Sequence, residues 1–263
     1  MYKDKTVWIT GASSGIGEAL VLNFAKQGAL VIISSRRIEA LEEVKAKCGA
    51  NKNNVIVQPL DLSSPENINT SAQTALSKID RLDYVFHNGG ISQRSLTHET
   101  NIDIDRKLME VNYFGTIALT KKILPFFLQQ GFGHFIITSS LSGVFGFPLR
   151  SAYCASKHAL HGYFDTLRAE QVKNNIYVTI VCPGFIKTNI SVNAIGKDGK
   201  STGQFDNSQN SGMSAEQCAR KMIDAATKKK KEIYIGNREI SMIYFKRYLP
   251  FIYYKLAASV KLD

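Results

Sequence analysis

The residues best suited to chemistry in this sequence are Tyr153 and Lys157, which bound the segment YCASK. On a helix, side chains four residues apart lie on the same face, so the lysine ammonium group would lie near the tyrosine hydroxyl. A tyrosine with its unperturbed pKa of about 10 is a weak base at neutral pH, but a neighbouring cation favours the tyrosinate and lowers that pKa. The spacing therefore predicts that Tyr153 donates or accepts a proton during a reaction.

Two further polar residues precede this pair. Ser140 closes a predicted strand, and Asn112 lies in the segment VNYFG. Open α/β sheets bind ligands at the carboxyl ends of their strands, so Ser140 can donate a hydrogen bond to a substrate oxygen that gains charge. Each residue also has a structural interpretation, because YxxxK occurs by chance on helices, serines end strands, and asparagines bond helix backbone. The catalytic interpretation gains weight because a glycine-rich turn occurs in the same chain.

That turn, TGASSGIG, joins the first predicted strand to the first predicted helix at residues 10–17. Glycines at such a junction let the backbone turn tightly and let a pyrophosphate approach, while free N–H groups at the helix start bind the anion. A strand-to-helix turn without a ligand is the alternative, but the position in the first βα unit favours a dinucleotide site. The expected cofactor contacts in this turn are Gly11, Ser13, Ser14, Gly15, Ile16 and Gly17.

The second predicted strand ends in SSRR, with Arg36 and Arg37 and with no acidic residue before Glu39. An NAD site has a carboxylate near this point that binds the ribose hydroxyls, and a carboxylate would repel the 2′-phosphate of NADP. Arginine can instead hold that phosphate through charge-assisted contacts. Two solvated arginines at a helix start are the alternative, although cations are mildly unfavourable there unless an anion compensates. The segment predicts NADP(H) as the cofactor.

Apolar β-branched runs alternate with longer segments of helical spacing along the chain. Such runs are typical of strands buried on both faces, and the alternation predicts a Rossmann-type α/β fold with a doubly wound parallel sheet. We expect a single domain over residues 1–263, because the length and the 44% apolar content fit one large core. The expected strands are 6–10, 30–34, 55–59, 84–87, 134–138, 177–181 and 232–235, and the expected helices are 16–27, 37–48, 65–79, 104–130 and 151–174.

Two segments stand outside this alternation. Residues 189–214 are rich in Gly, Asn and Ser and are long for a connection, which predicts a lid loop over the substrate. The tail, residues 236–263, mixes aromatic side chains with Lys and Arg and contains Pro250, so it is too broken for a bilayer span. We expect the tail to pack on the domain or on an oligomer partner, or to lie at a membrane surface.

The composition restricts the classes of partner. The net charge is +11, but the basic clusters at residues 36–37 and 228–231 carry no interleaved aromatics, so we do not expect nucleic-acid binding. The four cysteines are widely spaced and have no histidine at metal-ligand spacing, so we expect free thiols and no metal site. The first residues lack the charged and apolar regions of a signal peptide, which predicts a cytoplasmic protein.

These motifs resemble those of the short-chain dehydrogenase/reductase family over nearly the whole chain. The TGxxxGxG turn matches residues 10–17, PGxxxT matches residues 183–188, and the Asn-Ser-Tyr-Lys tetrad matches Asn112, Ser140, Tyr153 and Lys157. The resemblance implies that Tyr153 is the catalytic acid or base and that Lys157 lowers its pKa and binds the nicotinamide ribose. It also implies that Ser140 orients the substrate and that Asn112 holds a water in a proton relay.

The same resemblance implies further cofactor contacts. It places Asp61 near the adenine, Asn88 near the adenosine ribose, and Ile186 and Thr188 beside the nicotinamide amide; the remaining expected contacts are Leu62, Gly90, Pro183 and Gly184. One departure is visible, because the family's NNAG is HNGG here and His87 replaces an asparagine. We interpret His87 as a satisfied interior histidine rather than a catalytic one.

A closer likeness lies in ISQRS at residues 91–95 and TNISVNAI at residues 188–195. These segments resemble the member 7 and 7B branch of the family, a group of reductases associated with membranes and with lipid-like or steroid-like carbonyls. The resemblance implies a carbonyl reductase for a hydrophobic ketone, in a homodimer or homotetramer. The alternatives are an NAD-linked alcohol dehydrogenase and a nonenzymatic NADP(H)-binding protein that its tail holds at membranes or partners.

Overall fold

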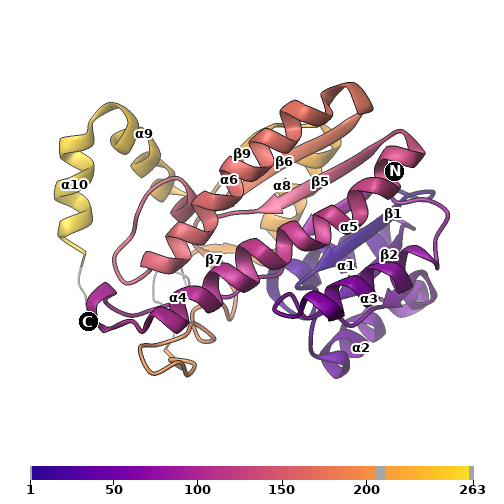
Figure 1. Cartoon of the computed structure of the whole chain (residues 1–263), viewed down its shortest axis with the longest axis horizontal. Helices are drawn as coiled ribbons and strands as arrows, with labels where there is room; N and C mark the ends of the chain where they lie inside the picture. Colours follow the sequence, from indigo (N-terminus) through magenta and orange to yellow (C-terminus); the bar gives the residue numbers. More distant parts are fainter. Residues whose placement is uncertain (1, 205–210, 261–263) are drawn as a thin grey trace.

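The fold is a parallel sheet between two layers of helices, as Figure 1 shows. The computed structural model describes residues 2–204 and 211–260. Seven strands lie in the order β3-β2-β1-β4-β5-β6-β9, and each neighbouring pair is parallel. The predicted doubly wound α/β fold is therefore confirmed. The strands are β1 (Thr6–Thr10), β2 (Leu30–Ser34), β3 (Val55–Val57), β4 (Tyr84–His87), β5 (Gly133–Thr138), β6 (Ile176–Pro183) and β9 (Glu232–Ile235).

Two apolar cores lie on the two faces of this sheet. In β1, Trp8 packs into one core, and Val7 and Ile9 pack into the other, because successive strand side chains point to opposite faces. Helices α1, α2 and α8 cover the face of Val7, and helices α3, α5 and α6 cover the face of Trp8. Their bounds are α1 (Gly15–Lys26), α2 (Ile38–Lys47), α3 (Pro65–Leu76), α5 (Gly115–Gln130), α6 (Ser151–Gln171) and α8 (Ala215–Thr227).

Some predicted elements differ from those observed, and some observed helices were not predicted. The strand expected at residues 55–59 ends at Val57, although the N–H groups of Gln58 and Leu60 still bond the carbonyls of Ile33 and Ser35 beyond it. The helix expected at residues 104–130 is divided into α4 (Ile102–Met109), a π-helical turn (Glu110–Phe114) and α5. Helix α8 was not among the predicted helices, although the capping box of Ser214 and Gln217 marks its start.

The tail forms two short helices that project from the domain in Figure 1, α9 (Ser241–Tyr248) and α10 (Pro250–Ala258). Pro250 occupies the first turn of α10, where its missing N–H group costs no helical hydrogen bond. None of the helices in the described part of the chain combines the length and the apolar character that crossing a membrane requires.

Candidate active site

The glycine turn forms a cradle at the carboxyl end of β1. Gly11 and Gly15 have φ angles of +63° and +59°, which favour glycine. A Cβ on Gly17 would overlap the carbonyl oxygen of Gly11, so the start of α1 lies directly against the turn. Ser14 is the N-cap of α1 but makes no side-chain capping bond, so its hydroxyl does not occupy the first N–H groups of the helix. These features fit a pyrophosphate, because the turn presents backbone donors at close approach.

Hydrogen bonds tie this turn to the ends of β4 and β5. Thr10 Oγ1 accepts the N–H groups of Asn88 at 3.1 Å and Gly89 at 3.0 Å. Asn88 Nδ2 donates to the Gly11 carbonyl at 3.4 Å, and Thr138 Oγ1 donates to Asn88 Oδ1 at 3.4 Å. The strand order reverses between β1 and β4, which is where doubly wound sheets bind ligands. Asn88 therefore lies at the centre of the expected cofactor cleft.

The two arginines predicted to select the cofactor follow β2, and Arg37 contacts the turn. Arg37 Nη2 donates to Ser13 Oγ at 3.3 Å. Arg36 is exposed and forms no salt bridge with any residue in ranges 2–204 and 211–260. Burial opposes ionisation of Asp61, but hydrogen bonds from Ser63 and the charge of Arg36 hold the pKa of this carboxyl below its ordinary value. Arg36 thus presents a guanidinium group that an anion can reach.

Tyr153 and Lys157 lie on one face of α6, and both are buried. Lys157 Nζ lies 5.8 Å from the centre of the Tyr153 ring and donates to the Thr138 carbonyl at 2.8 Å. Burial lowers the pKa of Lys157 to about 8. Burial also raises the pKa of Tyr153, against the opposing charge of Arg150 and a hydrogen bond with Ser140. Desolvation of the phenol is the largest of these causes, and the lowering of this pKa expected from Lys157 stays a prediction.

Ser140 and Asn112 complete the predicted tetrad, and they differ in how many of their polar atoms are engaged. Ser140 follows β5 in extended conformation, accepts the N–H group of Ser142 at 3.1 Å and donates to the Pro183 carbonyl at 3.4 Å. Asn112 is fully buried in the π-helical turn. Its amide bonds both backbone groups of Ile91, at 2.8 and 2.9 Å, and also donates to Ser156 at 3.0 Å. The Asn112 side chain therefore braces the loop after β4, and the water relay implied for it stays a prediction.

The remaining predicted cofactor residues surround these groups. A Cβ on Gly90 would lie 3.0 Å from Asn112 Oδ1 and 3.5 Å from Lys157 Nζ, so the loop after β4 passes close to the lysine. A Cβ on Gly15 would lie 3.0 Å from Thr188 Cγ2, which places the segment after β6 opposite the glycine turn. The other predicted contacts flank these groups. The Leu62 side chain lies against Gly89, and the Gly184 N–H group donates to the Ile235 carbonyl. Pro183 ends β6, Ile186 begins the short strand after it, and Ile16 lies in the first turn of α1.

Ile195, in the segment expected as a lid, packs against Tyr153. The Ile195 N–H group donates to the Ser92 carbonyl at 2.8 Å, and the Arg94 N–H group donates to the Ile195 carbonyl at 2.9 Å. Ile195 packs in a cluster with Tyr153 and Leu108, and only 8% of Tyr153 remains exposed. Of the expected lid, residues 189–204 and 211–214 belong to the described structure, and residues 205–210 lie outside the described residues.

Gln93 is a buried residue whose role the sequence analysis missed. Its Oε1 accepts the N–H group of Ala152 at 3.0 Å, and its Nε2 donates to Thr100 Oγ1 at 3.0 Å and to Ser95 Oγ at 3.2 Å. It therefore joins the loop after β4 to the start of the helix that carries Tyr153. The polar neighbours of Gln93 in ISQRS give no signal for this role, because its acceptor bond joins it to Ala152, 59 residues further along the chain.

His87 lies in the core, as predicted. Its ring stacks on Phe135 with 5.7 Å between ring centres, and its Nε2 bonds Thr120 Oγ1 at 2.9 Å. Burial lowers the pKa of His87 to about 3, so the ring is neutral. Its Nδ1 has no partner among the described residues, so the histidine is only half satisfied. In the same described ranges, no group of three or more His, Cys, Asp or Glu side chains could hold a metal ion.

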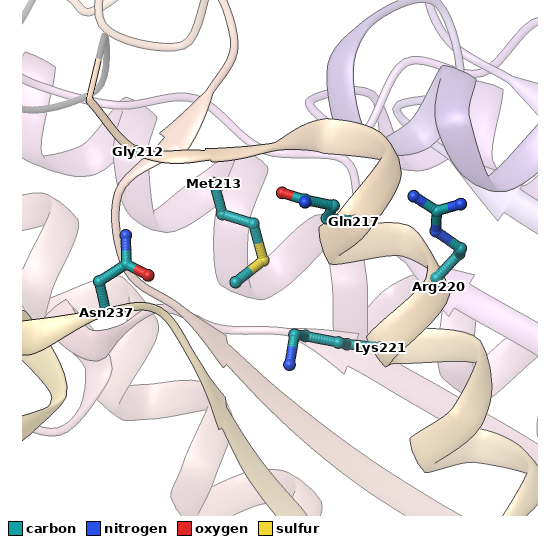
Figure 2. A pocket seen from close by; sticks show the side chains of 6 residues that line it. All are labelled: Gly212, Met213, Gln217, Arg220, Lys221 and Asn237. Carbon is teal, nitrogen blue, oxygen red and sulfur yellow. The ribbon is translucent and has the colours of Figure 1, made fainter.

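A surface hollow of about 470 Å³ lies beside α8, and Figure 2 shows its lining. The lining contains none of the predicted site residues, so we assign no reaction to this hollow. Its residues are Gly212, Met213, Gln217, Arg220, Lys221 and Asn237.

Comparisons with known proteins agree with this geometry. The sequence profile of the short chain dehydrogenase family matches residues 5–198. The chain is 38% identical to dehydrogenase/reductase SDR family member 7B of Mus musculus, over 98% of this chain and 81% of that protein. It is 37% identical to dehydrogenase/reductase SDR family member 7 of Homo sapiens, over 94% of this chain and 75% of that protein.

Solved structures share the fold. A short chain dehydrogenase/reductase from Burkholderia phymatum in complex with NAD superposes with a TM-score of 0.83 at 22% identity, covering 96% of both chains. ElxO with NADP bound superposes with a TM-score of 0.74 at 25% identity, covering 88% of this chain and 96% of that one. The chain therefore belongs to the short-chain dehydrogenase/reductase family of oxidoreductases and groups with its member 7 branch.

Proposed function

We propose that this protein is an NADP(H)-dependent carbonyl reductase with Tyr153 as its proton donor. The observation that supports this most is a continuous line of hydrogen bonds from the glycine turn to the lysine. Asn88 donates to the Gly11 carbonyl, Thr138 donates to Asn88, and Lys157 donates to the Thr138 carbonyl. The dinucleotide cradle and the acid–base pair therefore share one edge of the sheet.

The chain's own residues supply the proton chemistry. When bound, the nicotinamide cofactor supplies the hydride to the carbonyl carbon. Ser140 turns its hydroxyl hydrogen from the Pro183 carbonyl to the substrate carbonyl oxygen, and Tyr153 transfers its phenolic proton to that oxygen as charge develops. Lys157, with a pKa of about 8, is mostly protonated at neutral pH and stabilises the tyrosinate that remains. The raised pKa of Tyr153 keeps the phenol protonated before reaction, which suits an acid in the reductive direction.

The choice of NADP(H) rests on Arg36 and Arg37. Related structures hold NADP in one case and NAD in another, so the family does not decide it. No carboxylate follows β2 before Glu39, and Arg36 presents an unpaired guanidinium group within the described residues. Such a group holds a 2′-phosphate through charge-assisted hydrogen bonds. Cells usually keep the NADP(H) pool in its reduced form, which favours reduction of the carbonyl over oxidation of the alcohol.

The substrate class follows from the surroundings of Tyr153. Ile104, Leu108 and Ile195 pack with Tyr153 in one apolar cluster, and Ile91 lies against it. A hydrophobic or lipid-like ketone loses less on leaving water than a polar one when it enters such surroundings. The carbonyl oxygen is then the one polar atom that Ser140 and Tyr153 must satisfy.

The test follows NADPH oxidation with lipidic, steroidal, simple aromatic and small polar ketones. We expect turnover with the hydrophobic ketones, and a loss of about a thousandfold or more in kcat for Tyr153→Phe. Tyr163→Phe, on the same helix, is the matched control and retains activity. Faster turnover with NADH would favour an NAD-linked alcohol dehydrogenase. Full activity in Tyr153→Phe would overturn the mechanism, and no turnover with any carbonyl in the panel would leave a nonenzymatic NADP(H)-binding protein.

A further inference from the structure

The exposed apolar side chains of this protein gather on its last two helices. Eleven large hydrophobic side chains are exposed among the described residues, and six of them lie between residues 244 and 256. The other five are dispersed over the domain, and isolated exposed side chains of this kind need no explanation. A cluster marks a binding surface. We call these six the tail surface: Tyr244, Tyr248, Leu249, Phe251, Tyr254 and Leu256.

The tail surface is held in place by contacts on the opposite side of the same helices. The Tyr253 hydroxyl donates to the Gly146 carbonyl at 2.7 Å, and its ring packs edge-on against Phe145. Lys246 Nζ donates to the Val144 carbonyl at 2.8 Å. Ile243 and Tyr253 are buried, with 8% and 5% of each exposed. Helices α9 and α10 thus already bury one side against the domain, and the tail surface is what remains for a partner.

The charge of this region is of one sign. Between residues 241 and 260 the sequence contains Lys246, Arg247 and Lys255 and no Asp or Glu. Arg247 and Lys255 are exposed, and neither forms a salt bridge within the described ranges. Aromatic side chains flanked by unpaired cations are suited to an interface that is apolar inside and anionic at its border.

A second copy of the chain does not provide an interface that is apolar inside and anionic at its border. A two-fold symmetric contact would place Arg247 and Lys255 of both copies in one interface, and residues 241–260 contain no carboxylate to compensate these charges. An anionic phospholipid surface has both required parts, because its phosphates attract Lys and Arg while its acyl boundary accepts tyrosine and phenylalanine rings. Helices as short as α9 and α10 lie along such a surface rather than across it.

We propose that the tail surface docks this protein on an anionic phospholipid membrane. The helices rest on residues 144–146, which lie in the connection between Ser140 and Tyr153. In Figure 1 they stand at the end of the molecule where α6 begins. Docking would therefore bring the substrate side of the catalytic edge close to the lipid, where lipid-like ketones concentrate. This last consequence rests on the proposed function, whereas the docking itself does not.

The test measures binding of the full chain to vesicles by flotation. Vesicles of phosphatidylcholine with about one third phosphatidylserine are compared with pure phosphatidylcholine, and we expect binding to the anionic vesicles that weakens as salt is raised. A double variant, Tyr248→Ser with Phe251→Ser, should bind the anionic vesicles at least about tenfold more weakly. Val172→Ser is the matched control, because Val172 and Phe251 are both 70% exposed and Val172 lies at the far end of α6.

A charge variant separates the two parts of the surface. Arg247→Gln with Lys255→Gln should bind anionic vesicles about tenfold more weakly or worse, and should lose most of the salt dependence. Equal binding of the wild type and the Tyr248→Ser, Phe251→Ser variant would overturn the proposal. So would a change of oligomeric state in that variant, measured by sedimentation, without a change in vesicle binding, because a second copy would then be the partner. Flotation needs no turnover, so a failed reductase assay leaves this result unaffected.

Discussion

The site at the carboxyl ends of the strands has two halves that are held together in different ways. The cofactor half surrounds the glycine turn at residues 10–17, and the substrate half surrounds Tyr153. In the cofactor half, backbone touches backbone, and Gly17 leaves no room for a side chain against the Gly11 carbonyl. In the substrate half, side chains from distant segments meet: Gln93 accepts the N–H group of Ala152, and Ile195 packs over Tyr153. We therefore expect one added carbon to disrupt the cofactor half. We expect the loss of one hydrogen-bonding group to disrupt the substrate half.

The largest effect is expected for Gly17→Ala. The added Cβ would overlap the Gly11 carbonyl and displace the turn, so we expect NADPH to bind about a hundredfold more weakly or worse. Fluorescence titration of NADPH measures the affinity. Gly162→Ala is the matched control, because its Cβ would meet nothing within 4 Å and alanine favours a helix. Unchanged NADPH affinity in Gly17→Ala would mean that the cradle adapts, and the contrast between the two halves would fail.

The next effect concerns Arg36, which follows β2. Arg36→Asp replaces an exposed cation by an anion, so we expect the KM for NADPH to rise by about ten- to a hundredfold while the KM for NADH changes little. Steady-state kinetics with both cofactors provides the measurement. Lys173→Asp makes the same charge change on an exposed residue just after α6 and should leave both values unaltered. Retained NADPH preference in Arg36→Asp would show that the phosphate is held elsewhere.

The contrast also explains which parts the sequence predicted. The cofactor half is local: a continuous apolar strand, a run of glycines and a pair of arginines lie within residues 6–37, and each signal acts on its own neighbours. The strands were predicted for the same reason, because burial on both faces leaves an unbroken apolar run. Helix α8 carries an equally local signal in Ser214 and Gln217, but the low-complexity segment before it is typical of a loop.

The substrate half was less predictable because its contacts are long-range. The π-helical turn that divides α4 from α5 contains Asn112, which bonds the backbone of Ile91. The spacing of apolar residues along a helix does not reveal such bonds. The pKa of Tyr153 depends on how much of the chain covers it, which is fixed only when Ile195 is in place. The residue types identify which side chains take part in the chemistry. How deeply these side chains are buried depends on the folded structure.

A moderate effect is expected for Gln93→Ala. The Ala152 N–H group loses its acceptor, so we expect the free energy of unfolding to fall by about 1–3 kcal/mol. The KM for the ketone should rise while NADPH affinity stays the same, because the loop that pairs with Ile195 is no longer held. Denaturant unfolding and steady-state kinetics measure the two effects. Gln73→Ala, on the exposed side of α3, is the matched control and should change neither by a measurable amount.

The smallest effect is a pH dependence set by Lys157. Burial lowers the pKa of Lys157 to about 8, so the protonated fraction falls about twofold between about pH 7 and pH 8. Reduction needs that charge beside Tyr153 as the phenol gives up its proton, so kcat should fall about twofold over the same interval. The kcat measured with saturating NADPH and ketone at several pH values provides the check.

Stability should change with pH in the opposite direction. Between about pH 8 and pH 10.5 the folded state binds fewer protons at Lys157 than the unfolded state, because burial lowers the folded pKa from 10.5. This residue therefore makes the free energy of unfolding rise with pH in that window. Lys157→Met should remove the rise, and Lys173→Met, on an exposed side chain, should leave it in place. Equal pH slopes for the wild type and Lys157→Met would show that the folded chain does not depress this pKa, and the decline of kcat above neutral pH would then need another titrating group.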